Sequence, residues 1–387
     1  TSNSGDIDIY TKGAGGAGLI YLSGNSSIAA TNGVVTMATD GSITTFANSK
    51  ISAGGNILLD SNSGMLTLDG TVKATGTGSD IFLTADDMII SAAVSTTDGN
   101  IYLYDNNKGF TLGSNAGTGV KLNAAEIANL QPGGEGKGLT IGKGKQYAPG
   151  ADLYKKGGIA DDFSISSAGI TQSGAIDNED LDYTLITSAA IGIDASINAR
   201  NITLESGAAI DIKNKMEAKK NLLATASGNI TIGAELTAGH IEFVTRAESG
   251  GKIWQKTNAN VTATGIDSIV YDADGDFTSD ADNTSASFID ITSRKGSVYL
   301  NHTYVSETYI DVAAYQNISI GGTASLEAKG ANSGVGIKLR STNAGTITAT
   351  DGSTMRATTA SIDIATTSGN IDLGSDSITA QTNLIVK

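Results

Sequence analysis

The chain has 387 residues, of which 39% are hydrophobic and 17% charged, with 49 glycines, 2 prolines, no cysteine and a net charge of −15. The absence of cysteine excludes a disulfide-stapled module, and the many Ile, Val and Thr residues are untypical of a disordered chain. The acidic charge disfavours nucleic acid and anionic lipid as partners, and no apolar run approaches the ~18 residues of a membrane helix.

A short sequence frame recurs from the start of the chain. It consists of Gly or a small polar residue, then Asn, Asp or Ser, then two apolar residues on either side of a variable one. Within residues 1–121 its first apolar positions include Ile57, Ile81 and Ile101, which are 24 and 20 residues apart. The alternation is typical of a short strand with one buried face, and Gly and Asn favour left-handed bends between such strands.

A repeat of roughly 20 residues cannot bury an apolar face alone, but it can do so when stacked on a neighbouring copy. Residues 1–121 are therefore predicted to form the coils of a β-solenoid, with backbone groups paired between coils ~4.8 Å apart. This frame predicts an all-β, parallel fold rather than several globular domains.

The frame lapses over residues 122–183. Residues 122–130 have the apolar spacing of a short helix, and Pro132 ends it. A strand follows at residues 138–142, and then a basic, glycine-rich stretch at residues 143–158 is predicted to be a protruding loop. Because the frame resumes afterwards, we interpret this region as an interruption of one solenoid, with a short helix and a loop, rather than as a separate domain.

Residues 184–387 return to solenoid coils. The frame recurs at Ile202, Ile230, Val298, Ile318 and Ile371. In total the chain corresponds to roughly 17 coils. Both ends of the sequence are strand-like and lack a polar cap, and an open strand edge can pair with another strand. The predicted partner is thus a second copy stacked end to end, or further coils of a longer parent chain.

One segment carries a family likeness. Residues 122–130, LNAAEIANL, followed by residues 138–142, GLTIG, resemble a unit of the filamentous-haemagglutinin-type exoproteins of two-partner secretion systems. The resemblance implies a right-handed β-helix located outside the cell or on a bacterial surface, with a role in adhesion, aggregation or biofilm structure. The chain has neither the N-P-N signature of the secretion domain nor an anchoring segment, so the expectation is a central segment of a longer adhesin or a processed subunit.

The Asp-rich stretch at residues 271–283 is the strongest local signal. Asp272, Asp274 and Asp276 alternate as in a calcium loop, and Asp280 and Asp282 could add oxygen ligands. The loop signature fails after Asp276, because Phe277 replaces its glycine and Asn283 replaces its final glutamate. Calcium is the only cofactor that the sequence suggests, and solvated corners are the alternative reading.

Aromatic residues crowd into the region after residue 298. Tyr299, Tyr304 and Tyr309 could stack sugar rings of host or matrix glycans. The alternative is that they cap the core or form ladders between coils.

The function predicted from these features is that of an extracellular structural or adhesive β-helical protein, and not of an enzyme. A carbohydrate-active β-helix, either a polysaccharide lyase or hydrolase or a carbohydrate-binding module, is the alternative. The two histidines, His240 and His302, have no nucleophile signature beside them. Arg246, Lys252 and Lys256, around Trp254, come nearest to the basic cluster that an elimination reaction needs.

Overall fold

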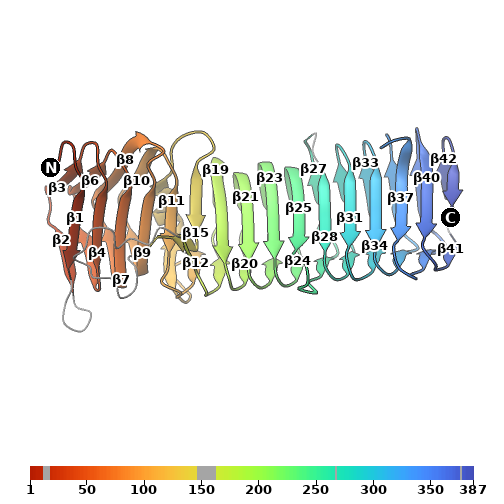
Figure 1. Cartoon of the computed structure of the whole chain (residues 1–387), viewed down its shortest axis with the longest axis horizontal. Helices are drawn as coiled ribbons and strands as arrows, with labels where there is room; N and C mark the ends of the chain where they lie inside the picture. The colour runs from red at the N-terminus through yellow and green to blue at the C-terminus, as the bar shows by residue number, and fades with distance from the viewer. Residues whose placement is uncertain (12–17, 146–162, 266–267, 375–376) are drawn as a thin grey trace. The chain divides into compact units, whose positions relative to one another are not determined.

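The computed structural model describes residues 1–11, 18–145, 163–265, 268–374 and 377–387. It is 59% strand and 1% helix, and its parallel stacked coils form a β-solenoid of about 16 turns that recur roughly every 22 residues. The predicted all-β solenoid is confirmed. The chain divides into two compact units, residues 1–195 and 196–387. Figure 1 shows the strands of each unit stacked side by side.

Unit 1 builds its coils from strands on several sides. One side comprises β1 (Ile7–Thr11), β4 (Val35–Thr39), β7 (Ile57–Leu68), β9 (Ile81–Ile90), β11 (Ile101–Tyr104), β15 (Gly138–Ile141) and β19 (Ile176–Thr187), and β2 (Leu19–Leu22) and β5 (Ser42–Thr45) extend it beside the second half of β7. A second side comprises β3 (Ser27–Ala30), β6 (Lys50–Ala53), β8 (Thr71–Thr77), β10 (Val94–Asp98) and β14 (Leu130–Gln131). A third comprises β12 (Phe110–Gly113), β13 (Val120–Asn123), β18 (Ile170–Gln172) and β20 (Ile191–Ile193).

The frame positions of unit 1 lie directly above one another. Ile57 pairs with Ile81, Ile81 with Ile101, and Ile101 with Leu139, in parallel register. All four side chains are fully buried. They form one column from which water is excluded, and the successive members of the column are the successive copies of the sequence frame.

The interruption is smaller than its sequence indicates. Its helix, α1 (Ala124–Ala128), is capped at its N-terminus by Asn123, whose side chain and that of Glu126 form a capping box. Within residues 122–183, β15 continues the ladder from β11 to β19, and β18 continues the ladder of β12. The predicted loop begins in β16 (Lys143–Gly144), which pairs antiparallel with β17 (Ser164–Ile165). Residues 146–162 lie outside the described part of the chain.

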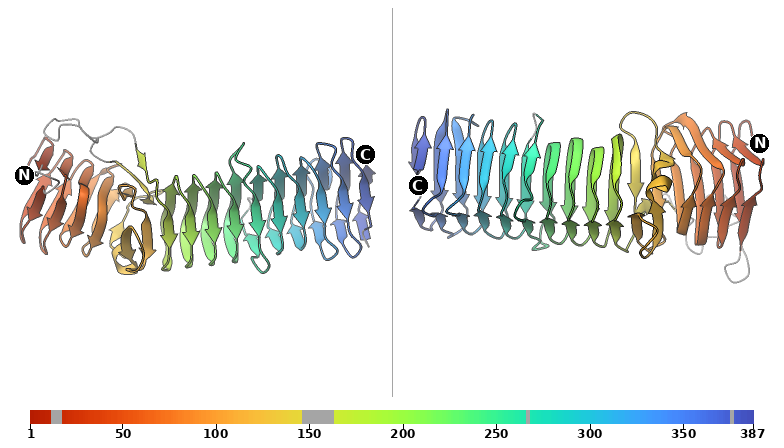
Figure 2. Two further views of the ribbon diagram at one scale, coloured as in Figure 1. Left: turned by 90° about the horizontal axis from the view of Figure 1, so that it is seen from below. Right: turned by 180° about the vertical axis from the view of Figure 1, so that it is seen from behind.

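Unit 2 is the more regular of the two (Figure 2). On its first side, the strands β21 (Ile197–Ser206), β23 (Met216–Ala226) and β25 (Leu236–Thr245) are long and bend round a corner. In the coils that follow them along the chain, each of three sides has one strand. The first side continues through β28 (Ile269–Ala273), β31 (Ile289–Ser293), β34 (Ile310–Ala314), β37 (Val335–Ser341), β40 (Ser361–Thr366) and β43 (Leu384–Val386). The second side comprises β22 (Ile210–Ile212), β24 (Ile230–Ile232), β26 (Ile253–Gln255), β29 (Phe277–Ser279), β32 (Val298–Leu300), β35 (Ile318–Ile320), β38 (Ile347–Ala349) and β41 (Ile371–Leu373). The third comprises β27 (Val261–Ala263), β30 (Asn283–Ser285), β33 (Thr303–Ser306), β36 (Ser325–Ala328), β39 (Thr354–Ala357) and β42 (Ser377–Ala380).

The second side of unit 2 carries the simplest pattern. Its strands are three residues long, and from β22 to β38 both outer residues of each strand are buried while the middle one points outward. The middle residues of successive strands pair with one another, so they form a single outward column. The ladder therefore fixes the position of each exposed side chain in this column.

Candidate functional site

The five aspartates of the predicted calcium loop lie on two different corners of one coil. Asp274 and Asp276 occupy the corner between β28 and β29, and Asp272 precedes them in β28. Asp280 and Asp282 occupy the next corner, between β29 and β30. The strand β29 separates the two groups, so the alternation in the sequence does not converge on one point.

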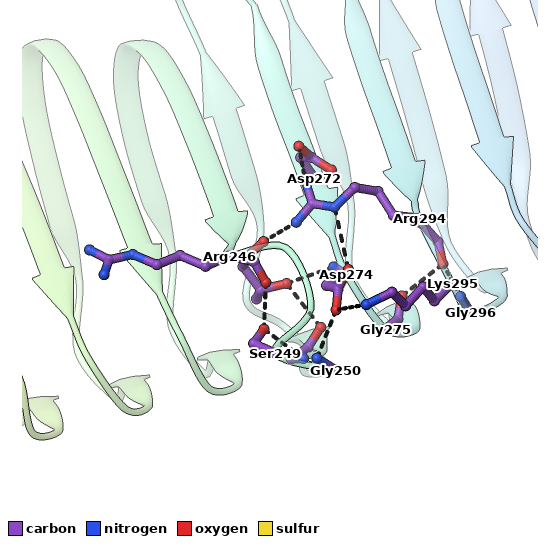
Figure 3. Close-up of polar contacts among 12 residues, drawn as sticks. Arg246, Ser249, Gly250, Asp272, Asp274, Gly275, Arg294, Lys295 and Gly296 are labelled. Atoms are coloured by element: carbon purple, nitrogen blue, oxygen red, sulfur yellow. Dashed lines mark hydrogen bonds and ion pairs between the residues drawn. The ribbon is translucent and has the colours of Figure 1, made fainter.

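Asp274 is the centre of an ion-pair network, drawn in Figure 3. Its side chain is only 1% exposed, and it accepts hydrogen bonds from the backbone N–H of Gly250 at 2.8 Å and from Lys295 Nζ at 3.1 Å. Arg294 Nε lies 3.6 Å from its other oxygen. The backbone N–H of Asp274 donates to Thr245 Oγ1 at 2.7 Å. These bonds tie three successive coils together at one corner.

Arg294 links the two aspartates. Its guanidinium also donates to the Asp272 carboxylate and to the Thr245 carbonyl oxygen. Burial raises the pKa of Asp272 in spite of this arginine. Burial opposes the ionisation of Asp274 as well, but the hydrogen bonds from Gly250 and Lys295 outweigh it and lower the pKa of Asp274. Arg294 and Lys295 therefore already hold the places beside these two carboxylates that a calcium ion would have to take.

The other three aspartates have partners of their own. Asp276 pairs with Lys252 Nζ at 2.7 Å, and Asp282 lies 3.5 Å from His302 Nδ1. Asp280 accepts hydrogen bonds from Trp254 Nε1 at 3.1 Å and from Asn301 at 2.7 Å. Across the described residues, no group of three or more His, Asp or Glu side chains is arranged to hold a metal ion. The five aspartates therefore do not converge on one point, and Arg294, Lys295, Lys252, Trp254, Asn301 and His302 already contact them, so the structure gives no support to the predicted calcium site.

The three tyrosines of the predicted glycan site have different environments. Tyr304 is fully buried, so its prediction as a sugar-binding residue is wrong. Tyr309 is half-buried and stacks on Phe288 with ring centroids 4.9 Å apart, which is the coil-to-coil ladder of the alternative reading. Tyr299 is exposed, because it is the middle residue of β32.

Tyr299 belongs to an outward column that sequence reasoning did not assemble. Trp254 in β26 pairs with Thr278 in β29, and Thr278 pairs with Tyr299 in β32. The two aromatic side chains therefore share one face of unit 2, two coils apart. The frame could have revealed the outward position of Tyr299, because Val298-x-Leu300 fits it, but Gln255 stands where the second apolar residue beside Trp254 should be.

A pair of neighbouring carboxylates lies on a different side of unit 2. Asp290 in β31 pairs in register with Asp311 in β34. Arg340 Nη2 donates to both oxygens of Asp311, at 2.9 and 3.0 Å. Burial and the negative charge of Asp311 raise the pKa of Asp290 to about 6. Tyr309, Asp311 and Lys338 also border a surface hollow of about 130 Å³.

The remaining candidates for catalysis each contact a different partner. His240 Nε2 lies 3.7 Å from Glu242, and Arg246 donates to Glu205 at 2.7 Å. Lys256 lies over the ring of Trp254, with Nζ 5.4 Å from the centroid. Arg246, Lys252 and Lys256 thus pair separately instead of forming one basic cluster.

Comparison of the chain with protein-family models, with curated proteins and with solved structures gave no match. The resemblance to filamentous-haemagglutinin-type exoproteins stays a prediction. Within the described parts of the chain, no helix has the length and apolar character needed to span a membrane.

Proposed function

We propose that the chain is a structural and adhesive segment of an extracellular β-helical protein on a bacterial surface. One observation carries the proposal: within each unit, parallel ladders hold the outward side chains in fixed columns, repeated from coil to coil at ~4.8 Å. A ladder of this kind offers many evenly spaced contact positions in a row, which suits binding to a repetitive surface. The resemblance of residues 122–142 is what favours the extracellular location.

The proposed partner of the strand edges is another coil. In β43, which pairs with β40, Leu384 and Val386 are 48% and 47% exposed. Apolar strand edges are ready to pair with further strands. A coil from a second copy would cover them.

Retention of coated beads under flow tests the adhesive function. Beads carrying the chain and beads carrying the same chain after heat unfolding are passed over bacterial cells and over extracellular matrix. The proposal predicts that beads with the folded chain are retained several-fold better, because only the folded ladder presents its columns. Equal retention of the two bead types on every surface would contradict it.

A carbohydrate-active enzyme is the second candidate, and the Asp290 and Asp311 pair favours it. Glycoside hydrolysis needs one protonated and one ionised carboxylate. Asp290, with its raised pKa, would donate a proton to the departing glycosidic oxygen, and Asp311, which Arg340 contacts through both carboxylate oxygens, would assist water or attack the anomeric carbon.

Incubation with neutral and acidic polysaccharides tests this second function. Hydrolysis gives new reducing ends, and elimination gives unsaturated ends. The enzyme reading expects reducing ends from the native chain and none from Asp290→Asn or Asp311→Asn. Product formation that survives both substitutions, or no product from any polysaccharide, would remove this candidate.

A further inference from the structure

The outward column on the second side of unit 2 alternates between hydroxyl and aromatic side chains. From β24 to β35 it reads Thr231, Trp254, Thr278, Tyr299 and Ser319, each paired with the next. Trp254 is 48% and Tyr299 38% exposed, so both rings offer free surface. A single contiguous apolar patch would be typical of a protein interface, whereas this column interleaves rings with hydroxyl groups.

Buried neighbouring residues fix the backbone position of both aromatic residues. The residues on either side of Trp254 in β26, and on either side of Tyr299 in β32, are fully buried. Since the ladder fixes the coil spacing, the two rings are about 9.6 Å apart along the column, two strand spacings. That distance is comparable with the spacing of alternate sugar rings in an extended β-linked glycan.

Polar and charged groups border the two rings, and the charges of these groups nearly cancel. Asp280 accepts a hydrogen bond from the indole N–H of Trp254 at 3.1 Å, and it also accepts one from Asn301. Lys252 and Asp276 pair at 2.7 Å on the other border, and Lys256 lies over the indole on its flexible stem. Two lysines and two aspartates balance one another, so the surroundings favour a neutral ligand that offers both hydrogen-bond donors and acceptors.

We propose that Trp254 and Tyr299 form a binding platform for an extended, neutral polysaccharide. Alternate sugar rings would stack their C–H faces on the two aromatic rings, and the sugar between them would lie over Thr278. Aromatic rings and sugars suit each other because both combine a flat apolar face with a polar edge. This inference rests on the proposed adhesive function and names the class of ligand that it recognises.

The single tryptophan of the chain makes a direct test feasible. Because Trp254 is the only indole, its fluorescence reports on the platform alone. The full chain is titrated with β-1,4-linked hexasaccharides of glucose and of N-acetylglucosamine. We expect a saturable change in emission and protection from quenching by acrylamide. The corresponding disaccharides should bind much more weakly, because they cannot reach both rings.

Substitutions separate the platform from a general effect of the surface. Tyr299→Ala keeps the fluorescent reporter, and its affinity for the hexasaccharides should fall by roughly tenfold or more, the size of one lost stacking contact. Tyr315→Ala is the matched control, since Tyr315 is 43% exposed but lies outside this column. It should bind as tightly as the native chain.

Several results would overturn the platform. These are a flat titration with both hexasaccharides, equal affinity of the native chain and Tyr299→Ala, or tighter binding of polygalacturonate than of the neutral sugars. Self-association that sedimentation detects and Tyr299→Ala abolishes would assign the face to a second copy instead. Native-level retention of beads carrying Tyr299→Ala, together with a flat titration, would leave the adhesive function standing and remove only the platform.

Discussion

At the scale of single residues, the interior of unit 2 contains a polar network that is fully hydrogen-bonded. The Tyr271 hydroxyl donates to Asn283 Oδ1 at 2.7 Å, and Asn283 Nδ2 donates to Gln255 Oε1 at 3.0 Å. Ser279 donates to the same Gln255 oxygen at 2.7 Å, and Gln255 Nε2 donates to the Ala259 carbonyl at 2.7 Å. Tyr271, Asn283, Gln255 and Ser279 are fully buried, so each bond replaces one that water can no longer provide.

Removing one hydroxyl from this network should destabilise the protein measurably. Tyr271→Phe leaves Asn283 Oδ1 buried without its donor, at a cost of about 1–2 kcal/mol in the free energy of unfolding. Tyr304→Phe is the matched control, because the equally buried Tyr304 hydroxyl faces Ser279 without forming a hydrogen bond of ordinary geometry. Urea unfolding of the two variants measures the difference. A loss of the same size in Tyr304→Phe would show that the network is not the cause.

The raised pKa of Asp290 predicts a pH-dependent stability. Its pKa of about 6 in the folded chain lies above the ~3.9 of an unfolded aspartate, so ionised Asp290 destabilises the fold. That penalty is complete above about pH 6 and absent below about pH 4. Asp311, Asp272 and Arg340 are the charges around Asp290, and Tyr309 is also close to it.

Asp290→Asn should therefore stabilise the chain at pH 7.5 and leave its stability unchanged at pH 4. The shift corresponds to about 3 kcal/mol at most, and solvent screening reduces the expected gain to about 1 kcal/mol. Urea titrations at the two pH values measure it. Asp372→Asn, at an exposed position of β41, removes the same charge and serves as the control. A gain of equal size at both pH values would refute the argument.

The residue scale is also where sequence reasoning was least reliable. Tyr299 points outward because the two apolar residues that flank it in the frame are buried. Tyr304 and Val305 are adjacent apolar residues, and only the ladder decides that Tyr304 points inward and Val305 outward. The alternating aspartates indicated a calcium loop, but the cations that neutralise Asp274 come from residues 294 and 295, one coil further along.

At the scale of the coil, the Gly and Asn residues of the frame have a different role from the left-handed bends that the sequence predicted. The frame residues Gly228 and Asn229 do not adopt the left-handed backbone conformation that was expected. The Asn229 side chain instead accepts a hydrogen bond from the backbone N–H of Lys252 in the next coil, at 2.9 Å. Asn317 does the same for Thr346, at 2.8 Å. Left-handed residues do occur at other corners, for example Asn258.

Glycine residues allow the backbones of successive coils to approach each other closely. A Cβ atom added to Gly251 would lie 2.4 Å from the Gly228 carbonyl oxygen, and one added to Gly296 would lie 2.6 Å from the Gly275 carbonyl carbon. Both contacts are with backbone atoms that the ladder holds in place. The glycines of the frame are therefore needed for the packing of one coil on another.

Gly251→Ala should destabilise unit 2 because its methyl group must push two coils apart. The expected loss is about 1–3 kcal/mol, as for other overpacked sites. Gly192→Ala is the control, since Gly192 is in β20, where a Cβ atom would meet nothing within 4 Å. It should be neutral or stabilise the chain by about 0.4–1 kcal/mol through the unfolded state. Thermal unfolding followed by circular dichroism would show the contrast, and equal midpoints for the two variants would contradict it.

At the scale of the whole molecule, the sequence predicted the architecture well for a physical reason. Each coil must bury the same face against its neighbours, so the repeat of the apolar pattern is also the repeat of the structure. The roughly 17 coils predicted from the frame compare with about 16 in the structure. The ladders through residues 122–183 were missed because β15 and β18 lie among insertions, where the spacing of the frame is lost.

Coils that contact only their neighbours should be removable as whole units. Deleting residues 310–336 takes out one complete coil and places Ile337 on Ile289, Ile347 on Val298 and Met355 on Tyr304, because each of these residues already occupies the equivalent position. We expect this variant to fold and to unfold cooperatively, with a modest loss of stability, since one interface between coils disappears.

Deleting residues 310–322 removes fewer residues but leaves a coil with β34 and β35 missing, so the strands that follow cannot meet their partners. This smaller deletion should abolish cooperative unfolding of unit 2 in circular dichroism and hydrogen exchange. If the complete coil is as costly to remove as the partial one, the coils are not interchangeable modules, and the case for a repetitive binding surface loses its basis.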